Sequence, residues 1–224
     1  MARKDYQTKL RELRENVLYM SELVMDRLRM SLEALESRDE DLAWQVIEGD
    51  SEINDLYLDI EQDCVDLLAL QQPVAGDLRL IVASFKIITD LERIGDLATN
   101  LGDYAKEAKE YTFPEVDIQE IGRDALDMLE DAMKAYEEEN TDLCYEIADR
   151  DDDLDAKCEN ISGVIIRELI ETEYEKEESE VEQILQDVSR LLLTVRDLER
   201  VGDHAVNISA RTLYMIENED ELIW

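Results

Sequence analysis

Hydrophobic residues recur every three or four positions along much of the chain, which is the period of an amphipathic α-helix. The first such stripe predicts a helix over about residues 5–37 and runs through Leu10, Leu13, Val17, Met20, Val24, Leu28, Ser31 and Leu35. The segment SRDED then supplies capping residues. A second apolar run begins at Leu42 and predicts a helix that continues to Gln71.

Two segments break the helical pattern and divide the rest of the chain. QQPVAGD ends the second helix because Pro73 cannot continue it, and Gly76 with Asp77 offers a new start. YTFPE has the features of a helix N-terminus and of a boundary between halves. The remaining predicted helices cover about residues 77–110, 115–138, 141–171 and 180–217. We therefore predict an all-α fold of six long helices.

The second half of the chain repeats the first. DLAWQVI from Asp41 matches DLCYEIA from Asp142, an offset of 101 residues. Glu92 matches Glu199 at an offset of 107, so about six residues enter at the connector before the last helix. A register kept across helices, with the length difference in a connector, is typical of a duplicated unit. The predicted architecture is two tandem three-helix bundles, residues 1–111 and 112–224.

Composition and charge narrow the class of protein. Only 7 glycines and 2 prolines occur, and 45% of the residues are hydrophobic, which favours long helices around a core. The 59 acidic and 23 basic residues give a net charge of −36, so a nucleic-acid partner is not expected. Acid is spread along the whole chain and would be screened in brine. We expect a salt-loving source, with a halophilic archaeon as the expected organism.

The chain carries no sign of membrane insertion or of a disulfide framework. Its start, MARKDYQTKLRELREN, is charged, and no stretch approaches the roughly 20 apolar residues that span a bilayer. We therefore expect a cytoplasmic protein. The three cysteines are odd in number and lack CxxC spacing, and we interpret them as small buried hydrophobes: Cys64, Cys144 and Cys158.

One heptad occurs twice, as DLERIGD at 90–96 and DLERVGD at 197–203. At about 100° per residue, its Glu and Asp share one helical stripe opposite the apolar face, Glu92 with Asp96 and Glu199 with Asp203, and the stripes extend to Asn100 and Asn207. Each copy contains a glycine, which costs about 1 kcal/mol relative to alanine inside a helix. Like charges at i,i+4 are also mildly unfavourable. Repetition of both costs indicates a function.

The preceding helix of each half supplies oxygen side chains that could face these pairs. Asp50 and Asn54 belong to the first half, and Asp151 and Asp155 lie 101 residues further on. If the two helices pack as neighbours, four oxygen-bearing side chains converge on one patch in each half. Such a set suits a hard cation, namely iron, manganese, magnesium or calcium, and zinc less typically. A bound metal would offset the like-charge repulsion.

Other interpretations of these residues stay open. A Glu/Asp pair in so acidic a chain is common by chance and is usually a solvated face. A ferritin-like di-iron core needs Glu-x-x-His motifs, whereas the one histidine, His204, has Leu97 at the matching place and is expected at a surface or interface. Arg93 and Arg200 could bind an anion, although intramolecular ion pairs are the simpler expectation. No residue set nominates a catalytic nucleophile.

Four segments together resemble the PhoU family, the accessory and regulatory proteins of the phosphate-specific transport system. They are VIEGDSEIND, QQPVAGDLRLI, DLERIGD and DLERVGDHAVNI, in the family's order and over nearly the whole chain. The resemblance implies two three-helix bundles, each with a multinuclear iron or zinc cluster on its surface. By position, the implied ligands are Asp50, Asn54, Glu92, Asp96, Asp151, Asp155, Glu199 and Asp203.

The resemblance also implies a function. Members repress phosphate uptake and phosphate-starvation genes when phosphate is plentiful, through the ATPase subunit of the ABC transporter and a membrane sensor kinase. Members are not known as enzymes, and from the resemblance we expect a homodimer. Asn54 departs from the family pattern and lowers the charge of the first site. Two alternatives remain: an accessory protein of another phosphate carrier with this bundle fold, and a carboxylate-bridged metal enzyme.

Overall fold

The computed structural model describes residues 3–70, 73–107, 117–172 and 178–223, and every regular element in these ranges is an α-helix. The predicted all-α fold is therefore confirmed. The helices are α1 (Arg3–Ser37), α2 (Glu40–Glu48), α3 (Asp50–Leu70), α4 (Ala75–Glu107), α5 (Ile118–Glu138), α6 (Thr141–Thr172) and α7 (Glu178–Glu217). The expected boundary segment YTFPE lies outside the described residues.

The second predicted helix is two helices, which corrects the sequence analysis. Gly49 separates α2 from α3, and its amide bonds back to the carbonyls of Gln45 and Val46 at 3.1 and 3.2 Å. Glycine is a poor helix former, and a Cβ at Gly49 would meet the Arg27 guanidinium at 2.4 Å. The helix of the second half has no such break, since α6 continues from Thr141 to Thr172.

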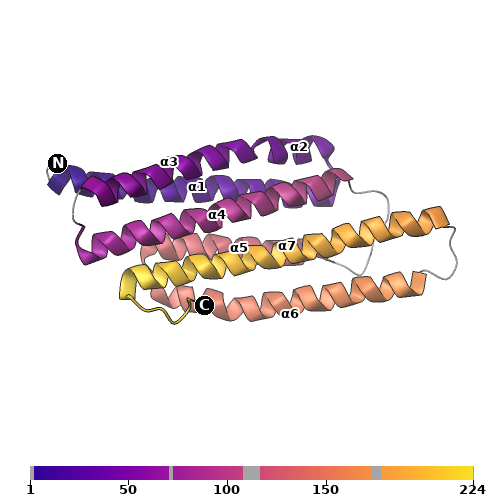
Figure 1. Ribbon diagram of the computed structural model, residues 1–224. Helices are drawn as coiled ribbons and strands as arrows, with labels where there is room; N and C mark the ends of the chain where they lie inside the picture. The colour runs from indigo at the N-terminus through magenta and orange to yellow at the C-terminus, as the bar shows by residue number, and fades with distance from the viewer. Residues whose placement is uncertain (1–2, 71–72, 108–116, 173–177, 224) are drawn as a thin grey trace.

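Two groups of helices lie side by side in Figure 1. α1, α3 and α4 pack against one another with α2 at one end, and α5, α6 and α7 form the other group. α4 and α7 contact each other along the middle of the molecule, and α1 also contacts α5. Buried side chains of both halves belong to one hydrophobic cluster, including Val17, Leu91, Leu129 and Leu198. The two repeats are thus joined by a continuous core.

A reciprocal pair of polar contacts links the two central helices. Asn100 of α4 donates to Asp197 of α7, and Asn207 of α7 donates to Asp90 of α4, each at 3.4 Å. The 107-residue offset of the repeat relates the two contacts. Asn100 and Asn207 therefore hold the two halves together. The stripe angle that placed Asn100 and Asn207 next to the acidic pairs did not reveal that they contact the other half.

Asp197 is the most enclosed charged group at this contact, with none of its side chain exposed. It accepts hydrogen bonds from the Tyr104 hydroxyl at 3.0 Å and from the Arg196 guanidinium at 2.8 Å. Its counterpart Asp90 bonds to His204 Nδ1 at 2.9 Å. His204 thus lies at an interface between the halves, as the sequence analysis expected.

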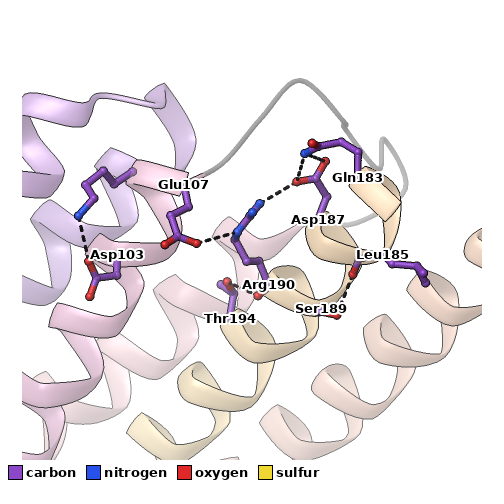
Figure 2. Close-up of polar contacts among 9 residues, drawn as sticks. Asp103, Glu107, Gln183, Leu185, Asp187, Ser189, Arg190 and Thr194 are labelled. Atoms are coloured by element: carbon purple, nitrogen blue, oxygen red, sulfur yellow. Dashed lines mark hydrogen bonds and ion pairs between the residues drawn. The ribbon is translucent and has the colours of Figure 1, made fainter. Parts of the chain in front are cut away.

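Arg190 ties the start of α7 to the end of α4 (Figure 2). Its Nε lies 3.2 Å from a Glu107 oxygen, and its NH1 lies 2.7 Å from Asp187 Oδ1. Thr194 donates to the Arg190 carbonyl in the next turn. The ion pair therefore joins the first turns of α7 to the last turn of α4.

The three cysteines agree with the sequence analysis. Cys64, Cys144 and Cys158 are free and buried, and burial raises the pKa of the Cys64 and Cys158 thiols to about 12. None of the helices in the described ranges combines the length and the apolar character that a membrane crossing requires.

Candidate metal centre

The first cluster begins where the chain turns from α2 into α3. Asp50 is the first residue of α3, where the partial positive charge of a helix N-terminus favours a carboxylate. Asn54, one turn later, donates its amide to Asp50 Oδ2 at 2.8 Å. Thr99 of α4 approaches Asp50 Oδ1 at 3.4 Å. The two predicted residues of α3 therefore form one polar unit that faces α4.

Glu92 and Asp96 of α4 complete this cluster. Burial raises the pKa of Glu92, and the negative charges of Asp96 and Asp50 raise it further, while Arg93 opposes them. Burial also raises the pKa of Asp96, and Asp50 is the next cause. Glu92 thus feels the charges of both Asp96 and Asp50, and Asp96 feels that of Asp50. The structure brings together the four residues that the sequence predicted for the first half.

The second cluster is more compact. One carboxylate oxygen each of Asp151, Asp155 and Asp203 lies within 4.8 Å of the others. Burial raises the pKa of Asp151 to about 6, and the charges of Asp155 and Asp203 are the next causes. Asp151 Oδ1 is buried without a hydrogen-bond partner. A buried carboxylate oxygen that lacks a donor is costly unless a cation or a proton satisfies it.

Glu199 stands beside these three carboxylates. Burial, then the charges of Asp155 and Asp203, raises its pKa. Glu199 and Asp155 also line an open hollow on the protein surface together with Ser162 of α6. All four residues predicted for the second half are therefore close together, and the cluster opens to solvent on one side.

The glycines inside the two heptads, Gly95 and Gly202, allow neighbouring helices to pack closely. A Cβ at Gly95 would lie 3.2 Å from Ile53 Cδ1 of α3. A Cβ at Gly202 would lie 2.5 Å from Leu154 Cδ2 of α6 and 3.2 Å from Asp151 Oδ1. In each half, the glycine lets the two helices that supply the acidic residues approach closely, and this approach brings the carboxylates together.

The two clusters differ in charge and in compactness. The first contains the neutral Asn54, whose amide already engages Asp50. In the part of the chain that the structure describes, Asp151, Asp155 and Asp203 of the second cluster are the one group of three acidic, histidine or cysteine side chains whose ligand atoms all lie within 4.8 Å of one another. We infer that the second cluster is the better prepared of the two for a cation.

The family model of the PhoU domain matches residues 17–105 and 118–212, which include both clusters. The chain belongs to the PhoU family. The PhoU homolog of Clostridium acetobutylicum is 34% identical over 219 residues, which cover 96% of each chain. PhoU of Escherichia coli is 31% identical over 217 residues, 96% of this chain and 86% of that protein. Both relatives are named phosphate-specific transport system accessory proteins.

Solved PhoU structures have the same fold. The crystal structure of PhoU from Pseudomonas aeruginosa superposes with a TM-score of 0.85 at 32% identity, covering 96% of this chain and 100% of that one. The phosphate transport system regulatory protein PhoU from Streptococcus pneumoniae gives a TM-score of 0.85 at 28% identity, covering 96% and 98% of the two chains. The resemblance found in the sequence is therefore confirmed at the level of family and fold.

The residues of this PhoU protein suit a hard cation. Carboxylate oxygens are preferred ligands of magnesium, manganese, calcium and iron. The second cluster contains four carboxylates. The unpartnered Asp151 oxygen and the raised pKa of its carboxyl show that the cluster lacks positive charge of its own. Arg93 pairs with Glu92 at 3.6 Å, and Arg200 lies 3.9 Å from Asp197, as the expected intramolecular ion pairs.

Sequence reasoning missed two residues that affect the clusters. Thr99 touches Asp50 from α4. The charge of Asp152 raises the pKa of both Asp151 and Asp155. The run of three aspartates at 151–153 was a signal for Asp152. Thr99 carried no comparable signal, because it lies three residues beyond the Glu/Asp pair.

Proposed function

We propose that this protein is an accessory regulator of phosphate transport that restrains phosphate uptake and the phosphate-starvation response when phosphate is plentiful. The observation that carries the proposal is the match of both halves to the PhoU domain, together with curated relatives named as phosphate-specific transport system accessory proteins. The expected partner is the ATPase subunit of the phosphate ABC transporter, and a sensor kinase is a second one. The protein acts in the cytoplasm as a homodimer in this proposal.

Metal ions stabilise these contacts in our proposal. Asp151, Asp155, Glu199 and Asp203 would hold one centre. Asp50, Asn54, Glu92 and Asp96 would hold the other. Iron or zinc in multinuclear clusters is the expected content, with magnesium, manganese or calcium as alternatives. The bound ions supply positive charge between helices that would otherwise repel. The proposed role is binding and regulation, not catalysis.

A pull-down tests the regulatory proposal. The full chain is immobilised in molar salt and exposed to the purified ATPase subunit of the phosphate transporter from the same organism. We expect retention of the subunit, and a difference in retention between low and high inorganic phosphate. The ATPase subunit of an unrelated ABC transporter is the control. Equal retention of both subunits, or of neither, would contradict the proposed partner.

A further inference from the structure

α3 packs against α4, and the surface between these two helices runs from the first acidic cluster to an exposed apolar end. This strip of surface, and the equivalent one in the second half, are called the grooves. Val65 and Leu68 lie 11 and 14 residues after Asn54 on α3. At about 100° per residue, both lie within about 40° of Asn54 around the helix axis. Leu78 and Phe85 precede Glu92 on α4 by 14 and 7 residues and share its face. Val65 is 48% exposed, Leu68 41% and Leu78 40%. These four residues are called the first apolar end.

The second half repeats the first apolar end at equivalent positions. The offsets of 101 and 107 residues that relate the two halves place Ile166, Leu169, Leu185 and Leu192 there, and we call these the second apolar end. Ile166 is 47% exposed and Leu185 43%, close to the values of their counterparts Val65 and Leu78. Figure 2 shows the Leu185 side chain directed away from the ion pairs of Arg190.

This repetition is hard to explain by the needs of the fold. The chain is 37% charged, so polar residues are freely available for exposed positions. Exposed apolar side chains nevertheless occur at equivalent positions of both halves, Val65 with Leu78 and Ile166 with Leu185, whereas Phe85, Leu169 and Leu192 also pack against the core. Exposed apolar side chains that recur at equivalent positions of two helix pairs are a candidate binding surface.

The charge around the apolar ends indicates which kind of partner could bind there. α3 carries seven acidic residues and no lysine or arginine, and the equivalent helix α6 carries ten acidic residues against Arg150, Lys157 and Arg167. A second copy of this chain would place its own acidic surface here and an anionic membrane its anionic headgroups, so neither complements the charge of the groove, and the proposed homodimer contact is not expected in it. A segment with lysine and arginine beside an apolar stripe has the complementary pattern. From Leu78 to Asp96 the groove is about 27 Å long at ~1.5 Å per residue, the length of an 18-residue helix.

We propose that each half binds one basic amphipathic helix of a partner protein in this groove. The apolar stripe of the bound helix covers the apolar end, and its basic residues lie against the acidic rim. This is the helix-in-groove mode of recognition, with anchors spaced three and four residues apart. One chain then holds two such helices, one in each half. The proposal depends on the exposed groove residues and not on metal in either cluster.

Binding of a synthetic peptide to the full chain tests this proposal. The probe is an 18-residue peptide of leucine and lysine with leucines at helical i, i+3, i+4, i+7 spacing. A peptide of the same composition with scattered leucines is the control, and molar salt screens unspecific attraction. Isothermal titration calorimetry is expected to show two striped peptides per chain and at least tenfold weaker binding of the scattered peptide.

Uncharged substitutions locate the two sites. We expect Val65→Ser with Leu78→Ser to reduce the stoichiometry to one peptide per chain, and Ile166→Ser with Leu185→Ser to do the same. The four substitutions together should weaken binding at least tenfold. The matched control is Tyr19→Ser with Trp44→Ser, which removes two exposed apolar side chains outside both grooves and should leave binding unchanged.

Four results would overturn the proposal. They are equal binding of the two peptides, undiminished binding to the fourfold variant, self-association of the wild type that the fourfold variant loses, and sedimentation of the protein with anionic vesicles. The third assigns the apolar ends to a second copy, and the fourth assigns them to a lipid surface. Circular dichroism checks folding, and Leu78→Asn with Leu185→Asn provides a milder variant if the fourfold one unfolds.

Discussion

Among the carboxyl groups of the second cluster, Asp151 has the pKa that is raised the most. Its pKa of about 6 in the folded protein lies above the ordinary value of 3.8, so the folded state holds the proton more tightly than the unfolded one. The metal-free fold therefore gains stability from this group as the pH falls from about 7 towards 4. Metal binding weakens over the same interval, because the ligand must be deprotonated.

The first prediction follows from this titration. In chelator, Asp151→Asn should melt at a higher temperature than wild type at pH 7, because the amide removes a buried charge. The gain should shrink at pH 5, where wild-type Asp151 is itself protonated. Differential scanning fluorimetry at both pH values measures the difference. A gain that is independent of pH, or a lower melting temperature for the variant at pH 7, would contradict the electrostatic account.

The second prediction concerns a glycine. Gly163 of α6 has open space around its Cβ position, so Gly163→Ala should stabilise the fold by about 0.5–1 kcal/mol. Gly202→Ala should instead destabilise it, because the new methyl group displaces Leu154 and crowds Asp151. Urea unfolding in molar salt compares the two variants. Equal stabilisation by both substitutions would show that Gly202 is not required for close helix packing.

At the residue scale, the sequence predicted the membership of the clusters but not every neighbour. Glu199 and Asp203 could be chosen among 59 acidic residues because their heptad repeats and keeps its glycine. Helical angles also placed Asn100 and Asn207 on these stripes, but they did not reveal that both contact aspartates of the other half. A stripe defines a direction around one helix, whereas the neighbour that it meets depends on how helices far apart in sequence pack.

At the element scale, the contact between α4 and α7 depends on a fully buried carboxylate. Asp197→Ala would leave the Tyr104 hydroxyl and the Arg196 guanidinium without their shared acceptor. We predict a loss of about 2–3 kcal/mol in the free energy of unfolding, since hydrogen bonds to buried charged groups are the strong ones. Asp90→Ala, at the equivalent but more exposed position, should cost less. Chemical unfolding that ranks the two variants in the opposite order would contradict this.

The helix limits show what a periodic pattern can and cannot predict. The predicted end of the first helix, residue 37, agrees with Ser37, and the predicted last helix ends at 217, as does α7. The division at Gly49 was not predicted, because the apolar period runs through it from α2 into α3. The Arg27 guanidinium of another helix occupies the space that a Cβ at Gly49 would need, and no local pattern predicts this contact.

At the scale of the whole molecule, the net charge of −36 opposes compaction. Raising the ionic strength from 0.1 to 1 M shortens the screening length from about 10 to about 3 Å, which weakens this repulsion. The melting temperature should therefore rise by several degrees over this range in potassium chloride. A melting temperature that does not change, or that falls with salt, would exclude charge repulsion as a main destabilising force.

The arrangement of the two halves was only partly accessible from the sequence. The offsets of 101 and 107 residues predicted the duplication, and the family match to two stretches agrees with a repeat. The continuous core across α4 and α7, and the Asn–Asp contacts that lock it, depend on a packing angle that no local pattern encodes. The division at residue 111 stays a prediction.

Metal content tests the central claim most directly. The protein is purified without chelator and measured by elemental analysis beside Glu92→Ala with Glu199→Ala, and beside Asp55→Ala with Asp59→Ala as an acidic control pair outside the clusters. We predict stoichiometric metal in the wild type and in the control, and a loss of most of it in the cluster variant. Metal-free wild-type protein, or a cluster variant that retains the wild-type content, would contradict the account.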